Sequence, residues 1–138
     1  MSTKKNRKHS TIILAVFLTL FYALIADLFW ITLVAGPLYH SVFPSIIEIK
    51  LIPAALFYLL FSSGLCYFAV IPSIDKMTLG GIVRAGFFGL NVYGGYALTI
   101  LAVFHFFTPI MACLEMLWGM VISIVVTTAT IKTLSLIK

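Results

Sequence analysis

Residues 11–35 read TIILAVFLTLFYALIADLFWITLVA, and this stretch decides the fold. It contains a single charged side chain, that of Asp27. A helix needs about 20 apolar residues to cross the hydrocarbon core of a bilayer, so this stretch is long enough to span a membrane. The alternative is a cleaved signal peptide, but the apolar core of such a peptide is usually only about 7 to 15 residues long. The sequence therefore predicts a retained transmembrane helix.

Further apolar stretches of similar length follow at about residues 51–71, 79–104 and 109–130. Proline suits the first turn of a helix and interrupts its interior. We therefore expect the first helix to end at Gly36-Pro37 and the fourth to begin at Pro109. The predicted fold is an all-α membrane protein, a four-helix transmembrane bundle. It forms one domain over residues 11–134, after a basic tail at residues 1–10.

The composition supports a lipid environment. Of the 138 residues, 62% are hydrophobic and 9% are charged, whereas soluble domains carry about 25% charged residues. The net charge of +5 raises the question of nucleic acid. However, the basic tail (Lys4, Lys5, Arg7 and Lys8) has neither interleaved aromatic residues nor a nucleic-acid reader motif. We therefore expect membrane lipid as a partner and no nucleic acid.

The distribution of basic residues predicts the orientation. Basic loops stay on the cytoplasmic side of a membrane. Placing the N-terminus inside leaves only Lys50 outside and gathers the other basic residues in the cytoplasm: Lys4, Lys5, Arg7, Lys8, Lys76, Arg84, Lys132 and Lys138. The sequence thus predicts a multi-pass protein of the cytoplasmic (inner) membrane with both termini in the cytoplasm. The outer connection at residues 39–50 is expected to lie in the membrane interface.

Small and polar residues recur in each predicted helix at spacings of three or four. Such stripes mark the contacts between helices in lipid, because small side chains let the backbones approach closely. The stripes are Ala15, Thr19, Ala23 and Asp27; Ala54, Tyr58, Ser62 and Cys66; and Glu115, Gly119, Ser123 and Thr127. The third helix has two neighbouring lines: Gly81, Ala85 and Gly89, and Arg84, Asn91, Gly95 and Thr99. Helix packing alone explains most of these residues.

The ionisable residues within the spans require a further explanation. A charged side chain at the centre of a span costs roughly 2.5 to 3.5 kcal/mol. At 1.5 Å per residue, Asp27 and Glu115 lie roughly 12 and 9 Å from the outer helix ends, and Tyr58 and Asn91 lie near the same level. We therefore predict one polar layer in the outer half of the bundle. Two carboxyls in such a layer repel, so at least one is expected to be protonated.

Trp30 and Trp118 each follow an acidic residue by three positions and so share a helix face with it. An indole N–H can donate a hydrogen bond to a carboxylate, although tryptophan is also common at membrane interfaces. No metal site is expected, because His40 and His105 lie in the outer connections without a recognisable ligand spacing. Nucleotide-binding loops and H-E-x-x-H are absent, so no cofactor is predicted.

Several motifs resemble an uncharacterised bacterial family of small integral membrane proteins, the domain-of-unknown-function family twenty-one seventy-seven. The matching stretches are Asp27-Leu28-Phe29-Trp30, Leu56-Phe57-Tyr58, Gly64, Tyr67-Phe68-Ala69-Val70, Pro72, Tyr93, Tyr96, Leu98, Thr99 and Glu115-Met116-Leu117-Trp118-Gly119. The family usually has Asp in place of Glu115, and Tyr-Asp-Leu-Thr-Asn where this chain has Tyr96-Ala97-Leu98-Thr99-Ile100. The resemblance implies a four-helix membrane fold and leaves reaction and substrate open.

The sequence leaves three functions open. The polar layer favours the handling of a small solute, an ion or a proton, and four helices that enclose so little space lead us to expect a homodimer. The second hypothesis is a structural or assembly subunit of a larger membrane complex. A membrane enzyme that acts on lipid ranks last, because no nucleophile or metal motif is present, and a non-enzymatic role is favoured. The candidate ligand-binding residues are Asp27, Trp30, Tyr58, Asn91, Tyr93, Glu115 and Trp118.

Overall fold

The computed structural model describes residues 2–42 and 50–137, with only the backbone described for residues 2–8. Within these ranges the chain is helical and contains no strand. The longer helices are α1 (Ser2–Trp30), α2 (Gly36–Val42), α3 (Leu51–Leu65), α4 (Leu79–Val103) and α5 (Pro109–Ile137). Two π-helical turns, Ile31–Ala35 and Cys66–Val70, and a 3-10 turn, Ile71–Ser73, continue α1 and α3. The connection that we expected in the membrane interface, residues 39–50, lies largely outside the described residues.

Four helical segments are long and apolar enough to cross a membrane: His9–Val42, Leu51–Ser73, Leu79–Val103 and Pro109–Ile137. Local chemistry explains where the last two begin. The Thr78 hydroxyl accepts a hydrogen bond from the backbone N–H of Gly81 at 3.2 Å, and the Thr108 hydroxyl accepts one from Met111 at 3.2 Å. These contacts cap the free N–H groups of a first turn. Pro109 begins α5, as predicted.

The first membrane helix does not end at Gly36-Pro37, where the sequence predicted its end. It widens into the π-helical turn, in which the Gly36 N–H bonds to the carbonyl of Ile31, and continues as α2 to Val42. A Cβ atom on Gly36 would lie 2.5 Å from that carbonyl oxygen, so the turn requires glycine. Because the π turn interrupts the regular bonding pattern just before Pro37, the missing proline N–H does not break the helix.

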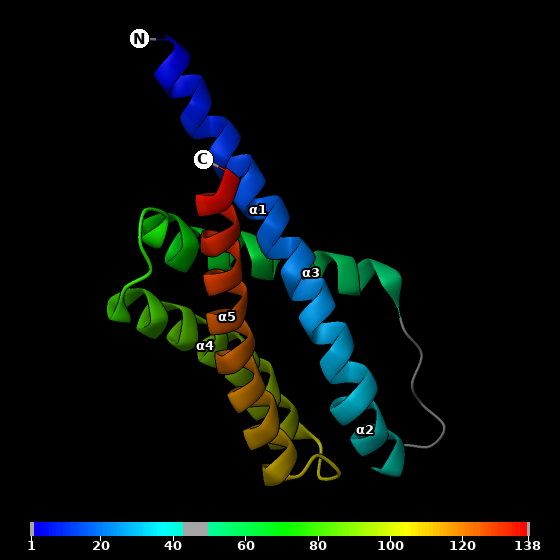
Figure 1. The fold of residues 1–138 in the computed structure, drawn as a ribbon. Coiled ribbons are helices and arrows are strands. Elements are labelled where there is room, and N and C mark those ends of the chain that lie inside the picture. Colours follow the sequence, from blue (N-terminus) through cyan, green and yellow to red (C-terminus); the bar gives the residue numbers. More distant parts are fainter. Residues whose placement is uncertain (1, 43–49, 138) are drawn as a thin grey trace.

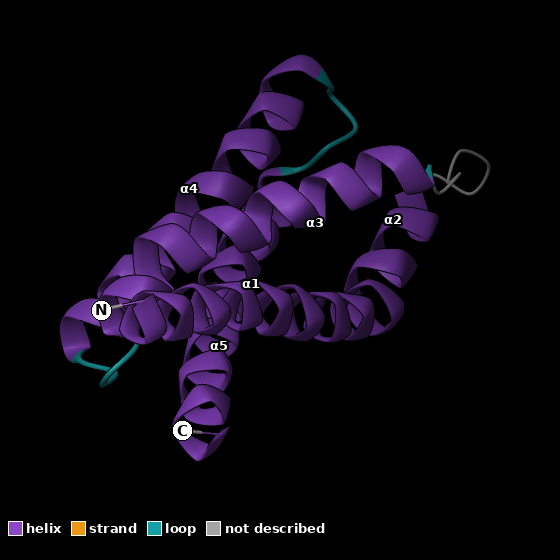
Figure 2. Ribbon diagram, turned by 90° about the horizontal axis from the view of Figure 1, so that it is seen from above, coloured by secondary structure: helices purple, strands orange, loops and turns teal. Residues whose placement is uncertain are grey.

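The four membrane-crossing segments alternate in direction. Figure 1 shows both termini at the top, and the end of α2 and the connection between α4 and α5 at the bottom. α4 and α5 make the most extensive contact, α1 packs against α5 and α3, and α3 touches α4 far less. The segments are splayed rather than parallel, which is clear in the view from above (Figure 2).

The core follows the predicted stripes. Ala15, Thr19, Ala23 and Asp27 of α1 are buried, as are Glu115, Gly119, Ser123 and Thr127 of α5. On α4, the buried line is Gly81, Ala85, Gly89, Tyr93 and Ala97. A Cβ atom on Gly89 would collide with the carbonyl oxygen of Gly119 and the hydroxyl of Ser123. α4 and α5 therefore cross with backbones nearly in contact, as small residues allow in membranes.

The other line on α4 (Arg84, Asn91, Gly95 and Thr99) is exposed, so its predicted place in the bundle interior was wrong. The polar groups of this line form hydrogen bonds although they lie outside the bundle interior. The Asn91 amide donates to the backbone carbonyl of Phe87 at 2.7 Å, and the Thr99 hydroxyl donates to that of Gly95 at 2.6 Å. Arg84 donates to the Ser73 hydroxyl at 3.1 Å.

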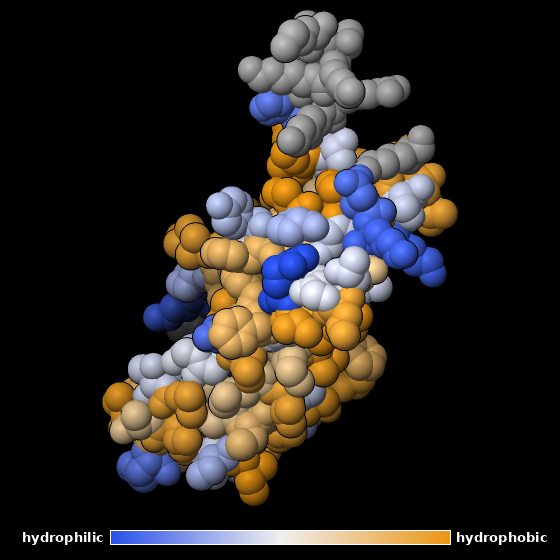
Figure 3. Space-filling model, turned by 90° about the vertical axis from the view of Figure 1, so that its left-hand side faces the viewer, coloured by the Kyte–Doolittle hydropathy of each residue, from blue (hydrophilic) through white to orange (hydrophobic). Residues whose placement is uncertain are grey.

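Large apolar side chains cover the outside of the molecule. Phe17, Leu60, Phe87 and Val125, one from each membrane-crossing segment, are between 53% and 74% exposed. Apolar residues dominate the face shown in Figure 3. A protein surrounded by water does not expose apolar patches of this extent. This exterior is typical of a membrane protein.

Candidate functional site

Asp27 joins all four membrane-crossing segments. It lies on the buried stripe of α1 and is only 6% exposed. Its Oδ2 atom accepts a hydrogen bond from the Tyr58 hydroxyl at 2.7 Å. Its Oδ1 atom accepts one from the Tyr93 hydroxyl at 3.2 Å and one from the Trp118 indole N–H at 2.8 Å. The donors come from α3, α4 and α5, so one carboxyl gathers a side chain from every other span.

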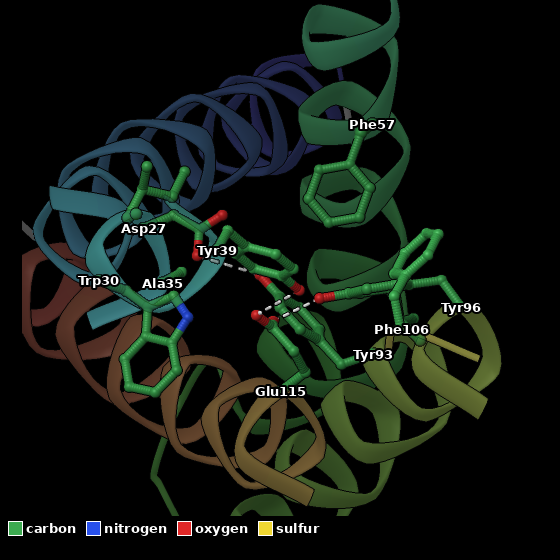
Figure 4. Close-up of a pocket in the computed structure, with 12 residues that line it drawn as sticks. Asp27, Trp30, Ala35, Tyr39, Phe57, Tyr93, Tyr96, Phe106 and Glu115 are labelled. Atoms are coloured by element: carbon green, nitrogen blue, oxygen red, sulfur yellow. Dashed lines mark hydrogen bonds between the residues drawn. The ribbon is translucent and has the colours of Figure 1, made fainter. Parts of the chain in front are cut away.

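Glu115 forms a second centre, one helical turn from Trp118 on α5. Its side chain is also 6% exposed. The Tyr39 hydroxyl of α2 donates to Oε1 at 3.2 Å, and the Tyr96 hydroxyl of α4 donates to Oε2. Figure 4 shows the Glu115 carboxyl between these two phenols and facing the same space as Asp27. The structure thus brings the two carboxyls to one site, as the sequence predicted.

The two tryptophans lie against each other. Their rings are 4.6 Å apart and within 4° of parallel, which places α1 and α5 in direct contact beside Asp27. The N–H of Trp118 is used by Asp27, whereas that of Trp30 is buried and makes no hydrogen bond within the described part of the chain. In Figure 4 the Trp30 nitrogen points toward the space between the carboxyls. A buried donor of this kind costs free energy until an acceptor reaches it.

Both carboxyls line one cavity, which has a volume of about 960 Å³. It lies toward the molecular end opposite the termini, and its lining is predominantly apolar. It is lined by Asp27, Trp30, Ile31, Ala35, Gly36, Tyr39, Phe57, Val92, Tyr93, Tyr96, Phe106 and Glu115. The volume is in the range of small-molecule sites, which reach about 1,000 Å³. An apolar hollow with a few convergent polar groups is the usual form of such a site.

The π-helical turn holds one wall of this cavity in place. Asp27, Ile31, Ala35 and Tyr39 follow each other at spacings of four and all line the cavity. In a uniform α-helix, positions four apart drift by about 40° around the axis per step. The wider π turn takes in more residues per turn and offsets part of this drift. Tyr39 therefore stays on the face of Asp27 and reaches Glu115.

The close crossing of α4 and α5 fixes the opposite wall. A Cβ atom on Gly119 would collide with the Tyr93 side chain, so Tyr93 lies directly over the α5 backbone. Tyr96 is one turn farther along the same face of α4 and reaches Glu115 in the same way that Tyr93 reaches Asp27. The spacing of three residues, in Tyr93/Tyr96 on α4 and in Glu115/Trp118 on α5, places the two centres one turn apart.

Most predicted site residues meet here, with one exception and two omissions. Asp27, Trp30, Tyr58, Tyr93, Glu115 and Trp118 belong to the two centres. Asn91 does not, because it lies on the exposed face of α4 and bonds to its own helix. The prediction omitted Tyr39, since the helix was expected to end before it, and Tyr96, although its spacing from Tyr93 was a usable signal.

The described residues include no group of three or more His, Cys, Asp and Glu side chains that could hold a metal ion. His40 and His105 are exposed and do not line the cavity. The chemistry available to the site therefore consists of two carboxyls, the phenol and indole groups that bond to them, and the aromatic walls. Such groups bind and orient a ligand by charge, hydrogen bonds and ring faces.

Comparison with known proteins identifies the family. One family model, described as "Predicted membrane protein (DUF2177)", matches residues 12–132. The chain belongs to this family. The match confirms the resemblance carried by the sequence motifs, and it covers both carboxyl centres of this DUF2177 protein. No curated protein and no solved structure matches the chain. The family description names no ligand or reaction, so the function must be argued from the site.

Proposed function

We propose that this DUF2177 protein binds a small solute in the cavity between Asp27 and Glu115, within the outer half of a bacterial cytoplasmic membrane. The observation that carries the proposal is the partly open cavity of about 960 Å³ whose lining includes both carboxyls. Carboxyls inside a membrane-spanning segment are costly, and they commonly mark binding or transport sites. A hollow that contains two costly carboxyls is best explained by a ligand.

The Trp30 N–H gives a second reason. It is buried at the cavity wall and lacks an acceptor among the described residues. It is directed toward Glu115 but does not complete a hydrogen bond to that carboxyl, in contrast to the Trp118 N–H, which bonds to Asp27. A solute that fills the cavity could accept a hydrogen bond from the Trp30 N–H.

The distribution of positive charges supports an outward-facing cavity. Lys76 and Arg84 lie in and just after the connection between α3 and α4, and Lys132 lies in the last turns of α5, whereas Lys50 precedes α3 at the opposite end of the second span. The rule that basic residues stay inside supports cytoplasmic termini and an outward-facing cavity. A cysteine introduced at His105, in a chain without its native cysteines, should react with a membrane-impermeant maleimide on intact cells. Protection of that cysteine until the cells are lysed would contradict this orientation.

The expected partners are membrane lipid and a second copy of the chain. Lipid covers the exposed apolar side chains of the spans. A second copy belongs to the proposal because four helices enclose too little space for a complete pathway across the membrane. Mass measurement of the protein in native lipid discs tests this point. A monomer would restrict the function to binding and exclude transport through a dimer.

The binding proposal can be tested with the two tryptophans of the chain, both of which lie at the site. The purified protein in lipid nanodiscs is titrated with a mixed panel of small cations, anions and neutral compounds while tryptophan fluorescence is recorded. Two variants that fill the cavity, Ala35→Phe and Val92→Phe, serve as controls. We expect a saturable change with at least one class of compound in the wild type and its loss in the filled variants.

A flat response to the whole panel would contradict the proposal. The same holds for a response of equal size and midpoint in both filled variants, because that signal would come from a surface site. Ser63→Ala is a suitable matched control, since Ser63 is exposed on α3 and bonds only to its own helix at Leu59. It should respond like the wild type.

A further inference from the structure

We propose that the ligand is an organic ammonium ion whose nitrogen faces Glu115 and whose apolar body lies among the aromatic rings of the cavity. This inference rests on the proposed function, because it names the chemical class that the same cavity would bind. Three features support it: the charge of the lining, the unequal use of the two carboxyls, and the aromatic rings of the walls.

The charge of the lining favours a cation. Asp27 and Glu115 supply two acidic groups, and none of the described residues that line the cavity is Lys, Arg or His. Unpaired carboxyls in a largely apolar site attract a positive group strongly, since the local dielectric constant is low. An anionic ligand would be repelled by an ionised carboxyl and would meet no compensating positive charge.

The two carboxyls are used differently, which identifies the one that meets the ligand. A carboxylate offers about four acceptor positions on its two oxygens. Asp27 accepts three hydrogen bonds, from Tyr58, Tyr93 and Trp118. Glu115 accepts two, both from tyrosines, and the Trp30 N–H is directed toward it without completing a hydrogen bond. Glu115 thus has one fewer completed hydrogen bond than Asp27, and an ammonium N–H can use a remaining acceptor position.

The walls suit a cation attached to an apolar body. Six rings line the cavity: Trp30, Tyr39, Phe57, Tyr93, Tyr96 and Phe106. The faces of such rings attract cations within about 6 Å and also bury apolar surface. Rings arranged around a positive group are the common solution for recognising organic ammonium compounds. A purely polar solute would leave most of this surface unused.

The same features disfavour a bare metal ion. Hard cations such as Ca²⁺ bind six to eight oxygen ligands. The cavity offers two carboxyls that already accept five hydrogen bonds from protein groups, and the described residues contain no metal-binding group. An organic cation needs only one or two charged contacts because its remaining surface is covered by the rings.

Three compounds of similar size separate the possibilities: 2-phenylethylammonium, neutral 2-phenylethanol and anionic 3-phenylpropionate. Each is titrated into the wild type in nanodiscs of uncharged, zwitterionic lipid, so that the membrane surface does not concentrate the cation. Tryptophan fluorescence is the readout. We expect the ammonium compound to bind about tenfold or more tightly than the alcohol, as a charge-assisted hydrogen bond would give. The anion should not saturate.

Glu115→Gln sharpens the test by removing the charge. It should reduce the preference for the ammonium compound over the alcohol to about twofold or less, since the charge-assisted bond is lost. Asp75→Asn is the matched control, because it removes one acidic charge from the exposed 74–78 connection. Asp75→Asn should keep the wild-type preference. The wild-type comparison of the three compounds stands even if Glu115→Gln does not fold.

The outcomes distinguish this inference from the proposed function. Tight binding of the alcohol or the anion, with weak binding of the ammonium compound, overturns the inference and leaves a solute-binding cavity. An unchanged preference in Glu115→Gln likewise overturns it, because the cation then binds elsewhere. Failure of every compound in the mixed panel removes the proposed function itself.

Discussion

The middle of the bundle and the end that carries the cavity use different residue types to opposite effect. At the middle, Gly89 and Gly119 bring α4 and α5 so close that neither position has room for a methyl group. Toward the outer end, the same two helices present Tyr96 and Glu115, and α3 touches α4 little, which leaves a cavity of about 960 Å³. Small residues close the helix contact, whereas aromatic rings hold the helices apart. The four predictions below test this contrast.

The closed crossing should be the least tolerant position. Gly89→Leu places a branched side chain against the carbonyl of Gly119 and the Ser123 hydroxyl, and should cost about 3 kcal/mol or more through overpacking. Gly95→Leu is the matched control, because a Cβ atom there has nothing within 4 Å. The SDS concentration at half-unfolding is the measurement. Equal midpoints for both variants would show that the crossing is not close-packed.

Asp27 should be the next most costly site to change. Asp27→Ala removes the acceptor of three donors from three helices, and each unsatisfied donor costs roughly 1 kcal/mol or more. We therefore expect a loss of about 3 kcal/mol in SDS unfolding. A loss no greater than that of Asp75→Asn would mean that Asp27 does not tie the spans together.

Glu115 should matter less for stability than Asp27. Glu115→Gln keeps one carbonyl oxygen as an acceptor for either Tyr39 or Tyr96, so the expected loss is about 1 kcal/mol. The corresponding change Asp27→Asn should cost more, because three donors compete for one remaining acceptor. Comparison of the two variants by thermal unfolding in detergent tests this order. The reverse order would contradict the division into a structural and a ligand-facing carboxyl.

The smallest effect is expected among the buried hydroxyls near the termini. The Thr19 hydroxyl donates to the Ala15 carbonyl at 2.7 Å and lies 3.4 Å from that of Thr130. Hydrogen bonds between membrane helices contribute about 0.6 kcal/mol on average, so Thr19→Val should cost about that much. Thr99→Val removes a comparable bond on an exposed face and should be nearly neutral. A loss above about 2 kcal/mol for Thr19→Val would indicate a larger polar network.

The sequence predicted the four spans and most of the contact stripes. Both can be read locally, because a span is a long apolar stretch and a stripe is a set of small residues spaced three or four apart. The sequence placed two lines of the third helix in the bundle interior, and only one of them is buried. Polarity favoured the line of Asn91, yet an exposed amide can bond to its own helix, as Asn91 does to Phe87. The glycine line proved to be the buried one because only glycine permits the backbone contact at Gly89.

The sequence favoured a polar pocket beside Asp27 and Glu115, but the size and the lining of the cavity could not be predicted. Both depend on how the helices splay, which is a property of the whole packing and not of any one stripe. Tyr39 was missed for a local reason, since Gly36-Pro37 normally ends a helix but here adjoins a π turn. The proximity of the two carboxyls and the two tryptophans could be predicted, because the cost of a charge in lipid and the spacing of three residues are visible without a structure.

The π turn at Ile31–Ala35 also gives the first helix a spare hydrogen-bonding register. If its carbonyls re-paired four residues apart instead of five, every residue beyond the turn would rotate by about 100° around the helix axis. Tyr39 would then leave Glu115 and swing away from the cavity, with no helix having to unwind. α2 is therefore joined to α1 by a turn that can change its hydrogen-bonding register, and this turn begins four residues after Asp27.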